Sequence, residues 1–202
     1  MWLGQAFRGP IGWSADPDVH QQVHTGTVAY KMLRPVDVPT YWFMRCMPIR
    51  FGTLMLRATP ILVVSYLVVG ITLPPSVGAL GAFCVSLVGA LVLSSALATL
   101  VTISLLWTVS GDGISRMMPT ITYALSGMAV PLPLVPDWFR PILEFPPFKG
   151  IIDTPFRFNL GHLPDWEIVV HTLHQLAWSL VLVLAGRLLF ARGRHHLVVQ
   201  GG

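Results

Sequence analysis

Long apolar runs, broken at only a few places, dominate most of the chain. The longest extends from residue 58 to residue 111 without an Asp, Glu, Lys, Arg or His. A helix crosses a bilayer in about 20 residues, so this run is too long for one span and has to fold back on itself. Leu73-Pro74-Pro75-Ser76 supplies the turn, because paired prolines break a helix. The apolar pattern predicts four transmembrane helices, at residues 53–73, 77–109, 114–135 and 168–189.

The composition agrees with an all-α integral membrane protein. Of 202 residues, 53% are hydrophobic and only 11% are charged, whereas soluble domains carry about 25% charged residues. The net charge of +4 raises nucleic acid or anionic lipid as a partner, but the basic residues stand near the ends of the predicted spans. Membrane topology explains them better, so we expect a lipid bilayer and no nucleic acid. Cys46 and Cys84 have no disulfide or zinc spacing, and both are expected to be reduced.

The first part of the chain is mostly polar. Residues 1–7 resemble the end of a preceding span and show no cleavable signal peptide. Asp16 can cap a helix, Pro17 suits its first turn and Gly26 can end it, so a short polar helix is predicted at residues 16–25. Val19 and Val23 share one face of that helix. Residues 8–52 therefore form one non-spanning segment, whose aromatic and basic residues 41–45 are typical of a membrane interface.

A proline- and tryptophan-rich turn follows the third apolar run, which has no charge from residue 117 to residue 136. Pro131 and Pro136 lack a backbone donor, so the carbonyls they leave free need partners in lipid. Asp137, Trp138 and Arg140 then give the turn an interfacial character. Two interpretations stay open: a helix end capped by a loop, or a short re-entrant or interfacial helix at the mouth of a transport path.

The polar connection at residues 136–167 precedes the last span, and a basic tail at residues 190–202 follows it. Counting Lys and Arg gives the orientation, because the richer side of a membrane protein is cytoplasmic. One side holds Arg8, Lys31, Arg34, Arg45, Arg50, Arg116, Arg187, Arg192 and Arg194. The other side holds Arg140, Lys149 and Arg157. Both visible ends are therefore expected in the cytoplasm, with residues 136–167 facing outward.

Few residues suggest chemistry. The phosphate-binding G-x-x-x-x-G-K-[ST] loop and the G-x-G-x-x-G fingerprint are both absent from the sequence, so we expect no ATPase activity, no catalytic residue and no cofactor or metal in this chain. His171 and His174 form an H-x-x-H pair, which fits either a metal or proton site or solvated interfacial histidines. Gly89, Ser94 and Thr99 offer an apolar, small-residue face to a substrate, but helix packing explains them equally well.

Three stretches together resemble the type-2 ATP-binding-cassette (ABC) transporter permeases, in particular a bacterial, drug-exporter-like branch. They are residues 26–37, residues 126–148 and the basic tail that ends in Gly201-Gly202. The resemblance implies six spans, a dimer of permeases and separate nucleotide-binding subunits that hold ATP and Mg. The family pattern places an ATPase-coupling helix at residues 16–25 and a re-entrant region before the last span. With four spans visible, the first two are expected to be missing, through truncation or a late start assignment.

The resemblance also assigns roles to individual positions. The ATPase-coupling residues are expected to be Asp16, Val19, His20, Val23, His24 and Gly26. The outward gate or re-entrant region is expected to contain Pro131, Pro136, Asp137, Trp138 and Arg140. The expected function is the permease subunit of an exporter for a hydrophobic or amphipathic substrate, in the bacterial inner membrane. The alternatives are a non-transporting membrane scaffold and a proton- or metal-coupled carrier that uses His171 and His174.

Overall fold

All regular structure in the described residues is helical. The computed structural model describes residues 37–64, 76–105, 112–127 and 135–193. The helices are α4 (Val38–Val64), α5 (Val77–Ser104), α6 (Asp112–Leu125), α7 (Arg140–Glu144), α8 (Phe148–Ile151), α9 (Asp153–Asn159), the 3-10 helix η3 (Asp165–Glu167) and α10 (Ile168–Gly193). The protein is therefore all-α, as the sequence predicts.

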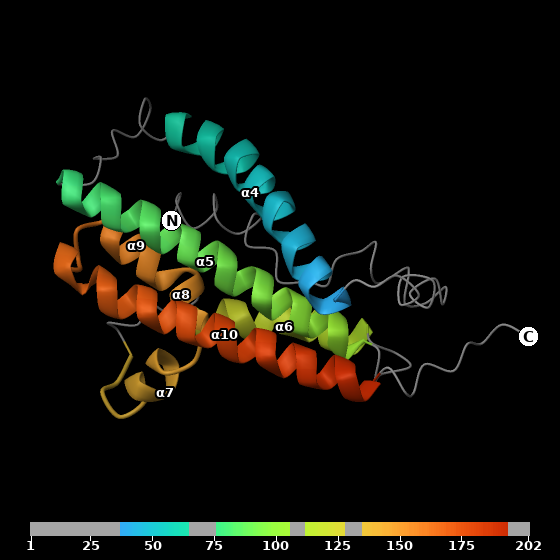
Figure 1. Cartoon of the computed structure of the whole chain (residues 1–202). Helices are drawn as coiled ribbons and strands as arrows, with labels where there is room; N and C mark the ends of the chain where they lie inside the picture. The colour runs from blue at the N-terminus through green and yellow to red at the C-terminus, as the bar shows by residue number, and fades with distance from the viewer. Residues whose placement is uncertain (1–36, 65–75, 106–111, 128–134, 194–202) are drawn as a thin grey trace, which may run out of the picture.

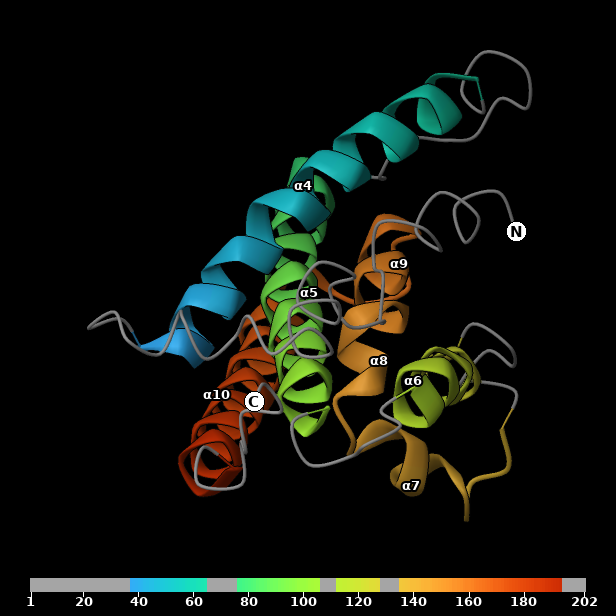
Figure 2. The same ribbon diagram turned by 90° about the vertical axis from the view of Figure 1, so that its right-hand side faces the viewer.

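Helix α5 lies at the centre of the fold, and the other long helices pack against it (Figures 1 and 2). Ser76 caps its first turn by accepting a 2.9 Å hydrogen bond from the backbone N–H of Ala79. Small residues along α5 are buried, among them Ala82, Ala90 and Ala98. Small side chains let neighbouring backbones approach closely, which explains why α5 holds the central position.

Helices α5 and α10 run in the same direction. Gln175 lies beside Ser86, Leu182 beside Leu97, and Gly186 beside Ile103, so residue numbers rise together along both helices. Gly186 allows a close approach, because a Cβ there would lie 3.1 Å from the Ile103 side chain. Because both helices run in the same direction, the chain that follows α5 has to return to the end of the bundle where α5 begins before α10 can start.

Helix α4 starts beside the C-terminal ends of α5 and α10 and runs in the opposite direction (Figure 1). Trp42, only 1% exposed, packs with Ile103 and meets Phe190 edge-to-face at 6.0 Å. Arg187 donates hydrogen bonds to Asp37 (3.0 Å) and to Thr40 (2.9 Å), and Thr40 in turn donates to Asp37. This contact begins the helix at Val38, well before the predicted span start at Thr53.

Helix α6 is shorter than the span predicted for it. Ile114 and Met118 pack against Val101 and Leu105, so α6 starts next to the end of α5. It ends at Leu125, before the predicted Val135, and a turn follows in which Gly127 has a φ of 80°. Glycine takes this left-handed conformation at little cost and commonly ends helices.

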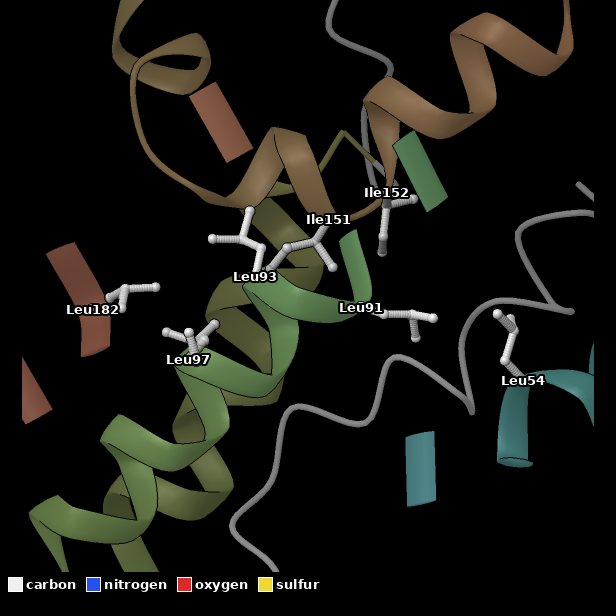
Figure 3. Packing of buried hydrophobic residues seen from close by; sticks show 8 residues of the cluster. Leu54, Leu91, Leu93, Leu97, Ile151, Ile152 and Leu182 are labelled. Atoms are coloured by element: carbon white, nitrogen blue, oxygen red, sulfur yellow. The ribbon is translucent and has the colours of Figure 1, made fainter. Parts of the chain in front are cut away.

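The connection between α6 and α10 folds back onto the bundle instead of staying at its end. Phe158 of α9 is fully buried with Ala82 of α5, and α8 packs against both α5 and α10. Figure 3 shows Leu93 and Leu97 of α5 between Ile151 of α8 and Leu182 of α10. The main hydrophobic cluster therefore joins the connection to the two long helices.

Two of the described helices, α5 and α10, are long and apolar enough to cross a membrane. They correspond to two of the four predicted spans. Helix α10 exposes an apolar face that includes Leu173, Leu180 and Leu188, as expected for a lipid-facing helix. Cys46 is buried and Cys84 exposed, and neither forms a disulfide.

Candidate functional site

A buried amide joins α10, α5 and α8. The side chain of Gln175 is 0% exposed. Its Nε2 donates to the backbone carbonyl of Gly150 at 2.7 Å and to that of Ser86 at 3.0 Å. One side chain thus binds backbone from two other elements. A polar group buried among apolar helices costs free energy unless it is paired, so these bonds favour one arrangement of the three elements.

Two glycines make room for this amide. A Cβ at Gly89 would overlap Oε1 of Gln175 and lie 2.8 Å from its Cδ. A Cβ at Gly150 would lie 3.1 Å from both Cγ of Gln175 and Cδ2 of Leu93. Oε1 has no hydrogen-bond partner among the described residues, but the hydrogen that replaces a Cβ at Gly89 points towards it. Gly89 therefore offers this oxygen a weak Cα–H···O contact.

A second contact lies one turn away on α10. His174 Nε2 and Trp178 Nε1 lie 3.0 Å and 2.8 Å from the same backbone carbonyl, that of Phe145. The Phe145 ring packs edge-to-face against Trp178, with ring centroids 5.5 Å apart. Pro146 and Pro147 follow directly and supply no N–H, so the turn has few backbone donors and the side chains of α10 add two more.

Both contacts lie several residues after the first residue of α10, so they are within the length of the helix and not at its end. At 1.5 Å per residue, Gln175 is about 10 Å from Ile168 along the axis, and Ser86 about 13 Å from Val77 along α5. Irregular backbone at membrane depth is tolerated only where its polar groups find partners in the protein. The carbonyls of Phe145 and Gly150 have such partners in His174, Gln175 and Trp178. Residues 145–152 lie against α10 through these contacts, and they are called the re-entrant segment below, after the prediction made for this region.

The structure describes some of the residues predicted for the outward gate and not others. Pro136 accepts hydrogen bonds from the N–H groups of Phe139 (2.9 Å) and Arg140 (3.1 Å), which starts α7. Asp137 and Arg140 form an ion pair at 3.4 Å, and Trp138 is 77% exposed. These residues lie together at the entrance to the connection, whereas Pro131 falls outside the described residues, as do the coupling residues Asp16, Val19, His20, Val23, His24 and Gly26.

The proposed substrate-facing residues of α5 are occupied by internal contacts. Gly89 faces the amide of Gln175. Ser94 donates to the carbonyl of Leu91 and Thr99 to that of Ser95, and both are buried. This arrangement favours the packing interpretation of all three residues.

Comparison with known proteins identifies the family. The family model described as ABC-2 family transporter protein matches residues 14–201. The chain belongs to this ABC-2 family. It is therefore a multi-pass membrane protein and a permease component of an ABC transporter. No curated protein and no solved structure gives a significant match.

Both histidines of the permease that were candidates for metal or proton binding have partners in the structure. His174 is bound to the Phe145 carbonyl. His171 lies 3.6 Å from Glu167 and meets the Phe158 ring edge-to-face at 5.7 Å. Within the described parts of the chain, no three His, Cys, Asp or Glu side chains gather to hold a metal ion. These contacts favour a structural role for the pair.

One carboxyl group in the connection has a shifted pKa. Burial raises the pKa of Asp153 from 3.8 to about 6, although the positive charges of Arg157 and Lys149 act in the opposite direction. Asp153 lies 3.8 Å from Arg157 one turn later on α9. Because the group is largely buried, its charged form is a cost to the folded permease that depends on pH.

Gln175 was missed by reasoning from the sequence. The available signal was an amide side chain within the predicted span at residues 168–189, since such groups in membrane helices hydrogen-bond to neighbouring helices. The proline pair at 146–147 gave a second signal, because its turn lacks backbone donors. Neither signal indicates which helix meets which turn.

Proposed function

We propose that this permease is the membrane-spanning subunit of an exporter that moves a hydrophobic or amphipathic substrate with ATP hydrolysed by a separate subunit. The observation that carries the proposal is the apolar character of α5, which has no charged residue from Val77 to Ser104. Its buried hydroxyl groups, such as those of Thr99 and Thr102, bond to carbonyls of their own helix. Such a helix contributes no fixed charge to the bundle, which suits a hydrophobic or amphipathic substrate.

The proposed assembly is the one that the family resemblance implies. A nucleotide-binding subunit supplies the site for ATP and Mg, and a second permease, identical or different, completes the translocation path. We place residues 16–25 on the ATPase as the coupling helix. Binding of ATP closes the ATPase pair, the coupling helices move with it, and rigid-body tilting of the permeases opens the path outward.

The orientation rests on the distribution of basic residues. Arg187 and Arg192 lie in the last part of α10, at the end of the bundle where α4 begins (Figure 1). We assign this end to the cytoplasm of a bacterial cell and the connection at residues 136–167 to the outer side of the inner membrane. Both visible chain ends are then cytoplasmic.

Copurification from the native host tests the proposal. The permease is purified in detergent, and we expect a P-loop ATPase and a second permease to copurify. Replacing residues 16–25 by a Gly/Ser linker should abolish recovery of the ATPase. A Gly/Ser replacement of the tail at residues 194–202 is the control and should leave recovery unchanged.

The same experiment separates the competing functions. A non-transporting scaffold predicts no ATPase in a monodisperse, folded sample, and that result would remove the exporter proposal. A proton- or metal-coupled carrier predicts transport without an ATPase and its loss in the His171→Ala, His174→Ala double variant. Recovery of the ATPase with the native chain, and its loss with the linker, supports the exporter.

A further inference from the structure

Helix α10 is attached at two separate places to parts of the chain that are far apart in the sequence. At one place His174, Gln175 and Trp178 hold the re-entrant segment through the carbonyls of Phe145 and Gly150. At the other place, later in α10, the helix holds the start of α4. Helix α10 therefore connects the re-entrant segment to the start of α4.

The second attachment combines polar and apolar contacts. Arg187 binds Asp37 and Thr40 at 3.0 Å and 2.9 Å, and Phe190 packs against the buried Trp42. Asp37 is the first described residue after the segment that contains the proposed coupling helix. This attachment therefore ties the first described residues of the chain to α10.

The stretch of α10 between the attachments is a continuous helix packed on α5. Gln175 and Arg187 are separated by about 18 Å along the axis, and α10 contains no proline from Ile168 to Gly193. Leu182 and Gly186 pack against α5 between the two attachments. Packed helices resist deformation because protein interiors are dense, and this favours joint movement of α5 and α10.

We propose that α5 and α10 form a rigid lever that joins the start of α4 to the re-entrant segment. The positioning residues at the end that holds the re-entrant segment are His174, Gln175 and Trp178. Those at the end that holds the start of α4 are Arg187 and Phe190. The re-entrant segment then moves with α10 during transport and is not an independent lid. The direction of the force, from the ATPase outward, rests on the proposed function.

Distances between spin labels test the lever in the purified complex with its ATPase, in nanodiscs. The background carries Cys46→Ala and Cys84→Ser. One pair, Leu160→Cys with Leu184→Cys, reports the connection relative to α10. A second pair, Met44→Cys with Leu184→Cys, reports the start of α4 relative to α10. All three label sites are exposed, and dilution with unlabelled permease removes distances between subunits.

For the wild type we expect one narrow distance distribution for each pair, with the same maximum before and after trapping with ATP and vanadate. In Gln175→Leu the Leu160–Leu184 distribution loses its single narrow maximum, while the Met44–Leu184 distribution is unchanged. Trp178→Phe, which keeps the ring and removes only the N–H donor, broadens it less. Ser179→Ala is the matched control, because Ser179 is buried on α10 and donates to the Gln175 carbonyl of its own helix.

Two results would overturn the lever. The first is a shifted Leu160–Leu184 maximum in the trapped wild type, which would make the connection a separately moving lid. The second is a narrow, unshifted Leu160–Leu184 distribution in both Gln175→Leu and Trp178→Phe. If Gln175→Leu fails to fold, Trp178→Phe together with His174→Ala decides the same question. The comparison of variants needs no nucleotide, so absence of a vanadate-sensitive ATPase would count against the proposed function and not against the positioning residues.

Discussion

Gly89→Ala is the sharpest test of the buried amide. The new methyl group would overlap Oε1 of Gln175 and lie 2.8 Å from Cδ. The amide would have to leave its position, and its bonds to Ser86 and Gly150 would be lost. Overpacking of this kind costs about 1–3 kcal/mol, and each interhelical hydrogen bond in a membrane protein contributes about 0.6 kcal/mol. The gain from replacing glycine by alanine in a helix offsets only about 0.5–1 kcal/mol.

The same substitution should behave differently when Gln175 is already alanine. The three nearest atoms to the new methyl group all belong to the Gln175 amide, and the third of them lies at 3.4 Å. Any other packing atom is therefore no closer than an ordinary contact. In the Gln175→Ala background, Gly89→Ala should be neutral or stabilising by up to about 1 kcal/mol. The expected coupling free energy is about 2 kcal/mol, within the range found for residues in contact.

The cycle is measured by reversible unfolding in mixed micelles, with tryptophan fluorescence as the signal. Four proteins are compared: wild type, the two single variants and the double variant. Gly81→Ala is the control, because Gly81 lies on the same helix and, among the described residues, no side chain or other element comes within 4 Å of its Cβ position. Additive effects within about 0.5 kcal/mol would refute the contact between Gly89 and Gln175.

The remaining predictions concern three side chains in contacts of α10 and the buried carboxyl group of Asp153. Trp178→Phe should lower the free energy of unfolding by about 0.6 kcal/mol through loss of the donor to Phe145, measured in the same micelles. Trp42→Ala should cost about 3–5 kcal/mol because the side chain is 1% exposed. In contrast, Arg187→Ala should cost less than about 1 kcal/mol because its ion pair with Asp37 is half exposed; equal losses for the two would contradict this assignment of energies. Asp153 binds its proton more tightly in the folded than in the unfolded permease. The free energy of unfolding should therefore fall by roughly 2–3 kcal/mol as the pH rises from about 4 to about 6, and then level off. In Asp153→Asn the thermal unfolding temperature should change less with pH over that range. A wild type whose stability rises there would show that the pKa of Asp153 is not raised.

The boundaries of the helices show where reasoning from a sequence works and where it stops. Ser76 and the prolines before it fix the start of α5 at Val77, because capping and proline chemistry are local. Helix α6 ends at Leu125 while the apolar sequence continues to Val135, so the apolar run alone does not give the end of the helix. Asp37 and Thr40 at the start of α4 also bind Arg187, which is distant in the sequence and could not be paired with them from the sequence.

The sequence by itself determined the membrane environment, the helical class and the family resemblance. Each follows from properties that add along the chain, such as uncharged length and the local effects of proline. Only the tertiary structure decided that α5 and α10 run parallel, that the connection folds back to their level, and that Gln175 meets Gly89, Ser86 and Gly150. These contacts depend on which helices pack together. An amide in an apolar span needs a hydrogen-bond partner, but the residues next to it in the sequence do not indicate which partner it binds.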